Sequence, residues 1–119
     1  MNNLSNKAFD ATDSHTDMRG ALRGNALRNA LAKRESGVPT YSVPEAAALL
    51  SISQEYLYRL IQADSFPAVQ MSIGGRQGRY VVPAKAVERI LDDAVASGRC
   101  IEAAAWTQAR NTATFGGAA

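Results

Sequence analysis

The fold is decided by residues 42–61, SVPEAAALLSISQEYLYRLI. Ser42 followed three residues later by Glu45 is the pattern of a capping box, so a helix is predicted to begin directly after Ser42. A second helix is predicted from Gln54 to Ile61, with Ser53 as its N-cap. Only three residues separate the two segments. The stretch therefore predicts two short helices joined by a tight turn.

The second helix has one apolar face and one polar face. Leu57, Leu60 and Ile61 follow the i, i+3, i+4 spacing of a helix that packs against a core. This placement turns polar side chains outward: Gln54, Glu55, Tyr58, Arg59 and Gln62. Of the two tyrosines Tyr56 and Tyr58, one is expected to pack against the core rather than project.

The residues that follow predict a β-hairpin and a third helix. Residues 68–71 and 80–82 have the length and composition of short strands. The loop between them carries three glycines, which permit the positive φ of a hairpin tip. Pro83 is expected to start the third helix and Gly98 to terminate it. Apolar residues recur along this helix at helical spacing: Val87, Ile90, Leu91, Ala94 and Val95.

Both ends of the chain are expected to be less ordered than its centre. Residues 1–16 are polar and aperiodic. Residues 17–33 predict a helix that two glycines weaken, so we expect it to form fully only on a partner. A short helix is predicted for residues 101–110. The predicted organisation is a flexible or conditionally helical basic arm (1–35), a central domain (36–98), and a short C-terminal helix with a loose tail (99–119).

Length and composition limit the class of protein. The 119 residues suffice for one small domain with appendages. A single cysteine excludes an intramolecular disulfide and a multi-cysteine zinc site. No apolar run approaches the ~20 residues of a membrane span, and the polar N-terminus differs from a secretory signal. We therefore expect a cytoplasmic protein without membrane contact.

The net charge of +2 is unevenly distributed. Residues 18–35 carry five basic side chains against Glu35, a net charge of +4. Residues 36–83 are balanced, with three arginines against three acids. The positive charge therefore precedes the two-helix motif. Residues 42–83 contain no histidine, no cysteine and no convergent acid pair, so neither an enzyme nor a metal or cofactor site is expected.

The order and spacing of these elements closely resemble the excisionase-type winged helix-turn-helix family, a small relative of the MerR DNA-binding domain. The resemblance implies a mainly α fold with a small β-hairpin and flexible N- and C-terminal extensions. The family usually has glycine where Ser51 stands and another where Asp64-Ser65 stands, and serine at positive φ is strained. Roughly half of the chain carries the resemblance, through Ser42, Glu45-Ala46-Ala47, Leu49-Leu50, Ser53, Tyr58-Arg59-Leu60-Ile61, Pro67-Ala68-Val69, Gly75-Arg76, Arg79-Tyr80 and Pro83.

Members of this family act as recombination directionality factors. They bind DNA beside the integrase site of a phage or integrative element, bend it, and direct recombination toward excision. The integrase, a tyrosine or serine recombinase, cuts the strands. The resemblance therefore implies a sequence-specific, nucleoid-associated DNA-binding protein with no enzymatic activity and no cofactor.

In this interpretation the second helix enters the major groove and the hairpin loop enters the adjacent minor groove. Arg59 is expected to contact guanine or phosphate, and Gln54 to contact adenine. Glu55 either accepts a hydrogen bond from cytosine or stays clear of the backbone, and Tyr58 donates to phosphate. The expected DNA-binding residues are Gln54, Glu55, Tyr58, Arg59, Gln62, Arg76, Gln77 and Arg79. Further backbone contacts are expected from Arg19, Arg23, Arg28, Lys33 and Arg34.

A neutral central domain with three arginines is expected to bind a single DNA site weakly. We expect the basic segment to lie along the DNA backbone and several copies to bind side by side. The same residues are compatible with three other functions. These are a transcriptional regulator of a phage or mobile element, a phage DNA-packaging recognition subunit that feeds an oligomeric ring through residues 83–110, and a protein-interaction module.

Overall fold

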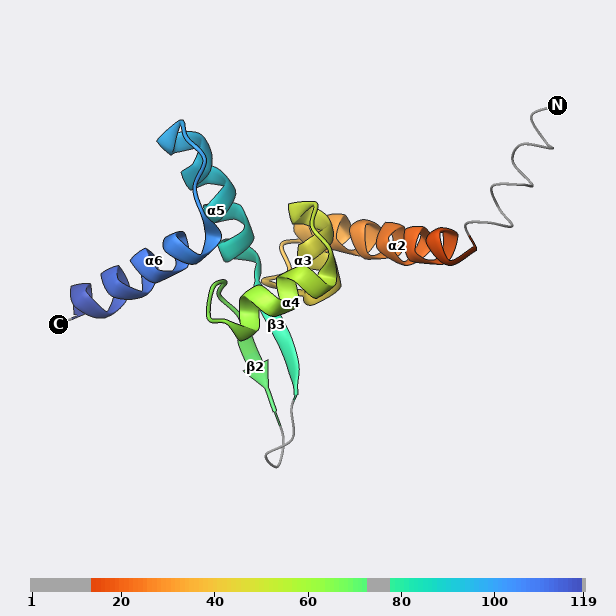
Figure 1. Cartoon of the computed structure of the whole chain (residues 1–119), viewed down its shortest axis with the longest axis horizontal. Helices are drawn as coiled ribbons and strands as arrows, with labels where there is room; N and C mark the ends of the chain where they lie inside the picture. The colour runs from red at the N-terminus through yellow and green to blue at the C-terminus, as the bar shows by residue number, and fades with distance from the viewer. Residues whose placement is uncertain (1–13, 73–77, 119) are drawn as a thin grey trace.

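The computed structural model describes residues 14–72 and 78–118 (Figure 1). Its fold is mainly helical with a small antiparallel sheet, which confirms the predicted winged helix-turn-helix class. The elements in chain order are α2 (Ser14–Ser36), β1 (Thr40–Ser42), α3 (Val43–Leu50), α4 (Gln54–Gln62), β2 (Val69–Met71), β3 (Arg79–Pro83), α5 (Ala84–Ser97) and α6 (Ala103–Ala118).

Local caps define the two helices of the motif. The Ser42 hydroxyl accepts a hydrogen bond from the Glu45 N–H at 3.3 Å, and the Glu45 carboxylate accepts one from the Ser42 N–H at 2.8 Å, so the predicted capping box is present. Ser53 caps α4 as predicted. Ser51, with φ 62°, ends α3, and Asp64, with φ 56°, follows α4. Ser51 and, within the pair Asp64-Ser65, Asp64 are therefore left-handed at the places where the resemblance favours glycine.

The hairpin belongs to a three-stranded antiparallel sheet of order β1-β3-β2. Val81 in the central strand pairs with Val69 on one side and with Ser42 on the other. The sequence did not predict β1, because three residues show no alternation and their conformation depends on pairing with β3. Gly78 permits the close approach of the two hairpin strands, since a Cβ there would lie 1.6 Å from the Met71 carbonyl oxygen.

The core lies between α3, α4, α5 and the inner face of the sheet. Leu57 from α4, Val82 from β3 and Val87 from α5 are fully buried in it. The apolar stripe predicted for the third helix packs only in part, because Leu91 is 46% exposed and Val95 is 83% exposed. Figure 1 shows that α5 extends away from the sheet.

Two flanking helices are longer than the sequence predicted. The helix α2 begins at Ser14, and α6 continues beyond Arg110. The C-terminal half of α2 packs along α3 through the buried side chains of Ala26 and Ala30. The small side chains of these two alanines allow α2 and α3 to approach closely. The two glycines that weaken the helix, Gly20 and Gly24, precede the docked residues.

The other flanking helix, α6, contacts the turn that follows α4. Trp106 stacks on Phe66 with ring centroids 6.2 Å apart, and its indole N–H donates to the Asp93 carboxylate at 2.8 Å. The Thr107 hydroxyl donates to the Ser65 carbonyl at 2.9 Å. Trp106 therefore anchors α6, and these contacts join α6 to the turn after α4 and to α5.

The molecule is elongated, with principal-axis extents of 67 × 44 × 29 Å. The helices α2 and α6 point to opposite sides of the central domain, and the hairpin of β2 and β3 projects in a third direction (Figure 1). Within residues 14–72 and 78–118, none of the helices combines the length and the apolar character needed to cross a membrane.

Candidate nucleic-acid interface

One face of α4 is polar and uncovered. Leu57 and Ile61 are buried on the opposite face, as the i, i+4 spacing predicted. The outward residues Gln54, Glu55, Arg59 and Gln62 are all exposed. The helix therefore presents two amides, one guanidinium group and one carboxylate, which are side chains that hydrogen-bond to base edges and phosphates.

The two tyrosines of α4 have different environments. Tyr58 is half-buried, and its ring meets the Tyr80 ring edge to face, with centroids 5.2 Å apart and an interplanar angle of 80°. Tyr56 is 52% exposed. Each flanks the apolar stripe by about a quarter turn, so helical spacing alone does not distinguish them. Tyr58 is the one that packs, because the hairpin lies on its side of α4 and provides Tyr80 as its partner.

The hairpin formed by β2 and β3 is the wing. Arg79 is exposed at the start of β3, where it pairs with Met71 across the sheet. Through the Tyr58–Tyr80 contact, the base of the wing is fixed beside α4. The predicted contact residues Arg76 and Gln77 lie outside the described residues.

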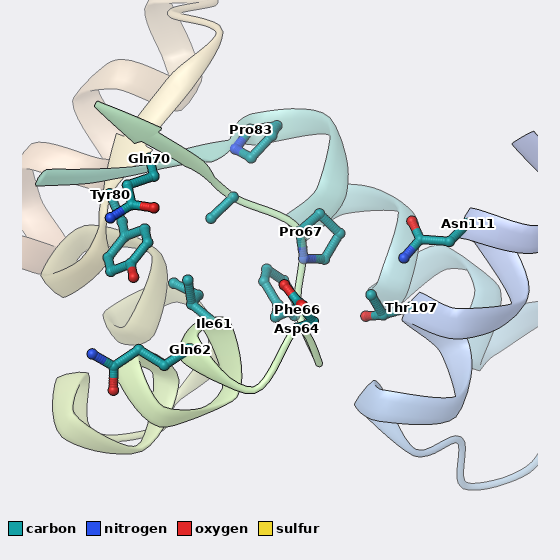
Figure 2. Close-up of a pocket in the computed structure, with 11 residues that line it drawn as sticks. Ile61, Gln62, Asp64, Phe66, Pro67, Gln70, Tyr80, Pro83, Thr107 and Asn111 are labelled. Atoms are coloured by element: carbon teal, nitrogen blue, oxygen red, sulfur yellow. The ribbon is translucent and has the colours of Figure 1, made fainter. Parts of the chain in front are cut away.

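Three hollows surround α4. A groove of about 480 Å³ lies between the start of α3 and α4, lined by Val43, Pro44, Gln54, Glu55, Tyr58, Arg59 and Gln62. A second, of about 680 Å³, lies between α2, α3 and the start of α4. A third, of about 510 Å³, lies between the end of α4, the sheet and α6, with Gln62, Tyr80 and Thr107 in its lining (Figure 2). Four of the predicted DNA-binding residues of α4 thus line the first groove together with Tyr58.

Comparison with known families finds a similarity in the central part of the chain. Residues 40–94 match the model of a helix-turn-helix domain family. This is a DNA-binding family, and the match begins at β1 and ends within α5. No curated protein and no solved structure is significantly similar to the chain. The helices α2 and α6 therefore lie outside the matched helix-turn-helix domain.

The basic residues of α2 are divided between two environments. Lys33 forms an ion pair with Glu45 at 2.7 Å, and Arg34 forms one with Glu88 at 2.9 Å. These two side chains therefore hold α2 against the helix-turn-helix domain. Arg23 is exposed and lines the groove between α2 and α4.

The remaining two basic residues of α2 lie elsewhere on the helix. The Arg28 guanidinium group donates to the side chain of Asn25, one turn earlier. Arg19 lies in α2 one turn before Arg23. The predicted backbone contacts of these five residues stay a prediction, and the side chain of Arg19 lies outside the described part of the chain.

Glu45 is the charged group on which the docking of α2 depends. It is buried, and burial alone raises the pKa of a carboxyl group. The hydrogen bonds from Lys33 and Ser42, together with the charge of Lys33, outweigh this effect and hold the pKa of Glu45 below its ordinary value. The carboxylate is therefore ionised at neutral pH, and one side chain serves both the capping box and the ion pair to α2.

Proposed function

We propose that the chain is a sequence-specific double-stranded DNA-binding protein in which α4 enters the major groove and the wing enters the adjacent minor groove. The observation that carries this proposal is the uncovered polar face of α4. Its side chains line an open groove, while the Tyr58–Tyr80 contact fixes the wing beside it. The match of residues 40–94 to a DNA-binding helix-turn-helix family supports the same assignment.

The proposed contacts follow from the chemistry of the exposed groups. Gln54 and Gln62 present amides, which pair with the adenine edge in the major groove. Arg59 contacts guanine or phosphate, and Glu55 accepts from cytosine N4 or stays away from the backbone. Arg79 pairs with Met71 at the loop end of the wing, and we expect its guanidinium group to approach the minor groove.

The biological role that we propose is that of an excisionase, or recombination directionality factor. Its copies bind side by side at the attachment site of a mobile element, bend the DNA, and direct the integrase toward excision. The resemblance in residues 42–83 supports this role. The balanced charge of the central domain supports binding by several copies, because one domain neutralises few phosphates. The protein acts in the cytoplasm, on the nucleoid.

Footprinting on the attachment-site DNA of the protein's own mobile element tests this proposal. Unrelated DNA of equal length is the control. Protection of several adjacent repeats, with the altered gel mobility of bent DNA, is expected for a directionality factor. Protection confined to a promoter favours a transcriptional regulator instead. If the protein shows no preference between the two DNAs at low salt, the excisionase proposal is wrong and a protein-interaction module is favoured.

A further inference from the structure

The groove between α2 and the helix-turn-helix domain contains arginines from two separate elements. Arg23 enters its lining from α2, and Arg59 enters it from α4. Ala26 and Ala47 form part of its apolar floor. Guanidinium groups are the side chains best suited to phosphate oxygens, because each offers several N–H donors in a fixed plane.

The position of Arg23 is set by the docking of α2. Ala30 is fully buried against the domain, and the ion pairs of Lys33 and Arg34 hold the following turn. Arg23 lies only three residues before Ala26, which is buried. Because Arg23 and Ala26 belong to the same helix, the docking of Ala26 and Ala30 also fixes the position of the Arg23 backbone relative to the domain.

Some basic side chains of α2 form ion pairs with the domain, and Arg23 does not within the described residues. Lys33 and Arg34 are neutralised by acids of the domain. In the part of the chain that the structure describes, neither Arg23 nor Arg59 forms an ion pair. Glu55 also lines the groove and reduces its positive charge, but two guanidinium groups against one carboxylate leave a net positive charge.

We propose that this groove binds a backbone phosphate of DNA between Arg23 and Arg59, on the flank of the site that α4 enters. This inference rests on the proposed function and adds α2 to the DNA-binding surface. The groove shares Pro44, Gln54, Glu55 and Arg59 with the groove between α3 and α4. The phosphate site is therefore continuous with the proposed base-contacting surface, which favours DNA over a free anion as its occupant.

The consequence is a wider contact with DNA than a helix-turn-helix domain makes alone. The 23 residues of α2 form a helix about 35 Å long. Only its C-terminal half is docked, and the other half extends away from the domain (Figure 1). Because α2 lies outside residues 40–94, this contact is a property of the present chain rather than of the matched domain.

The test compares Arg23→Gln with Arg89→Gln in the full chain. The two variants change net charge equally, but Arg89 is an exposed residue of α5 and does not line the groove. Binding to a mixed-sequence duplex is followed by fluorescence anisotropy over a range of KCl concentrations. We expect Arg23→Gln to weaken binding roughly three- to tenfold at low salt and to reduce the salt slope by about 1, as for loss of one phosphate contact. Arg89→Gln should leave the slope unchanged.

Each result bears on the proposal. Equal slopes for the two variants overturn it. If the wild-type protein binds, Arg79→Gln weakens binding and Arg23→Gln matches Arg89→Gln, the groove proposal fails while the proposed DNA-binding function stands. Failure of the wild-type protein to bind duplex DNA at low salt overturns both. Thermal unfolding of each variant confirms that the fold is retained, which is expected because both arginines are exposed.

Discussion

At the scale of single residues, Ser51 shows how the motif tolerates a departure from the family pattern. Its φ of 62° places a Cβ in a conformation that costs about 1–2 kcal/mol for residues other than glycine. Glycine at this position would remove that cost, but the greater conformational freedom of glycine in the unfolded chain would offset part of the gain in stability. We expect Ser51→Gly to stabilise the protein by about 0.5–1 kcal/mol in urea unfolding.

Ser53→Gly is the matched control for this change. Ser53 has an ordinary extended backbone, and its hydroxyl caps α4. Replacing such a cap with glycine destabilises by only a few tenths of a kcal/mol, about 0.3. A Ser51→Gly variant no more stable than the wild-type protein would show that the left-handed turn carries no strain.

Glu45 gives the fold a pH dependence whose sign follows from its environment. The pKa of Glu45 is lowered in the folded state, so its stabilisation is fully present above the unfolded pKa of about 4.3 and is lost as pH falls through the folded pKa. Glutamine at this position keeps a capping-box residue but loses the ion pair to Lys33. We expect Glu45→Gln to cost about 1.5 kcal/mol at pH 7.

Denaturation of both proteins from pH 7 to pH 3 measures this effect. The difference in unfolding free energy between wild type and Glu45→Gln should shrink as the pH falls below the unfolded pKa. Glu88→Gln is the control, because it removes a more exposed ion pair to Arg34 and should cost only about 0.5 kcal/mol. A constant difference across the pH range would mean that the charge of Glu45 does not stabilise the fold.

At the scale of elements, the Tyr58–Tyr80 contact joins α4 to the wing. The sequence predicted Tyr58 as a phosphate donor, whereas its packing suggests that it positions the wing. Tyr58→Phe keeps the ring and removes the hydroxyl, so we expect stability and DNA affinity close to wild type. Tyr58→Ala should lose about 2 kcal/mol of stability through lost burial and ring contact. Urea unfolding and anisotropy measure the two effects, and a Phe variant that loses as much affinity as the Ala variant would restore the phosphate-donor role.

The contact between α6 and the turn after α4 is a second link between elements. Thr107 donates to the Ser65 carbonyl beside the hollow in Figure 2. Thr107→Val preserves the shape of this buried side chain but leaves the carbonyl without its donor, so we expect a loss of about 1 kcal/mol in thermal unfolding. Thr40→Val, at an exposed position of β1, should change stability very little. Equal effects of the two changes would show that the hydrogen bond does not hold α6.

The elements that the sequence predicted are those that nearby residues specify. The capping box of Ser42 and Glu45 depends on a few positions in a row, so it was predicted correctly. The left-handed φ of Ser51 agrees with the glycine that the family resemblance favours there. The strand β1 and the choice between Tyr56 and Tyr58 depend on distant parts of the chain, so the sequence left them unresolved. For the candidate site, the exposed face of α4 followed from helical periodicity, whereas the position of Arg23 required the docking of α2.

At the scale of the whole molecule, the shape is set by its two flanking helices. The Cα radius of gyration is 17.8 Å. A compact chain of this length is expected to have a radius of about 13.5 Å. The difference arises because α2 and α6 extend from opposite sides of a small core (Figure 1). An elongated protein with a helix on each side of its DNA-binding domain is suited to contact a length of duplex rather than a single point.

The last prediction concerns whether α2 is formed before DNA binds. The sequence predicted that the basic segment completes its helix on a partner. Ala26, Ala30 and the Lys33–Glu45 ion pair hold α2 on α3 through contacts within the chain itself, so we predict that α2 is already formed in the free protein. A preformed helix loses little conformational entropy on binding, so DNA affinity is not reduced by the free energy of folding the arm. We therefore expect amides of residues 26–33 to be protected from hydrogen exchange in the free protein, and helical ellipticity to change little when duplex DNA is added. A gain in ellipticity matching the 23 residues of α2, with rapid exchange before DNA is added, would instead establish that the arm folds on its partner.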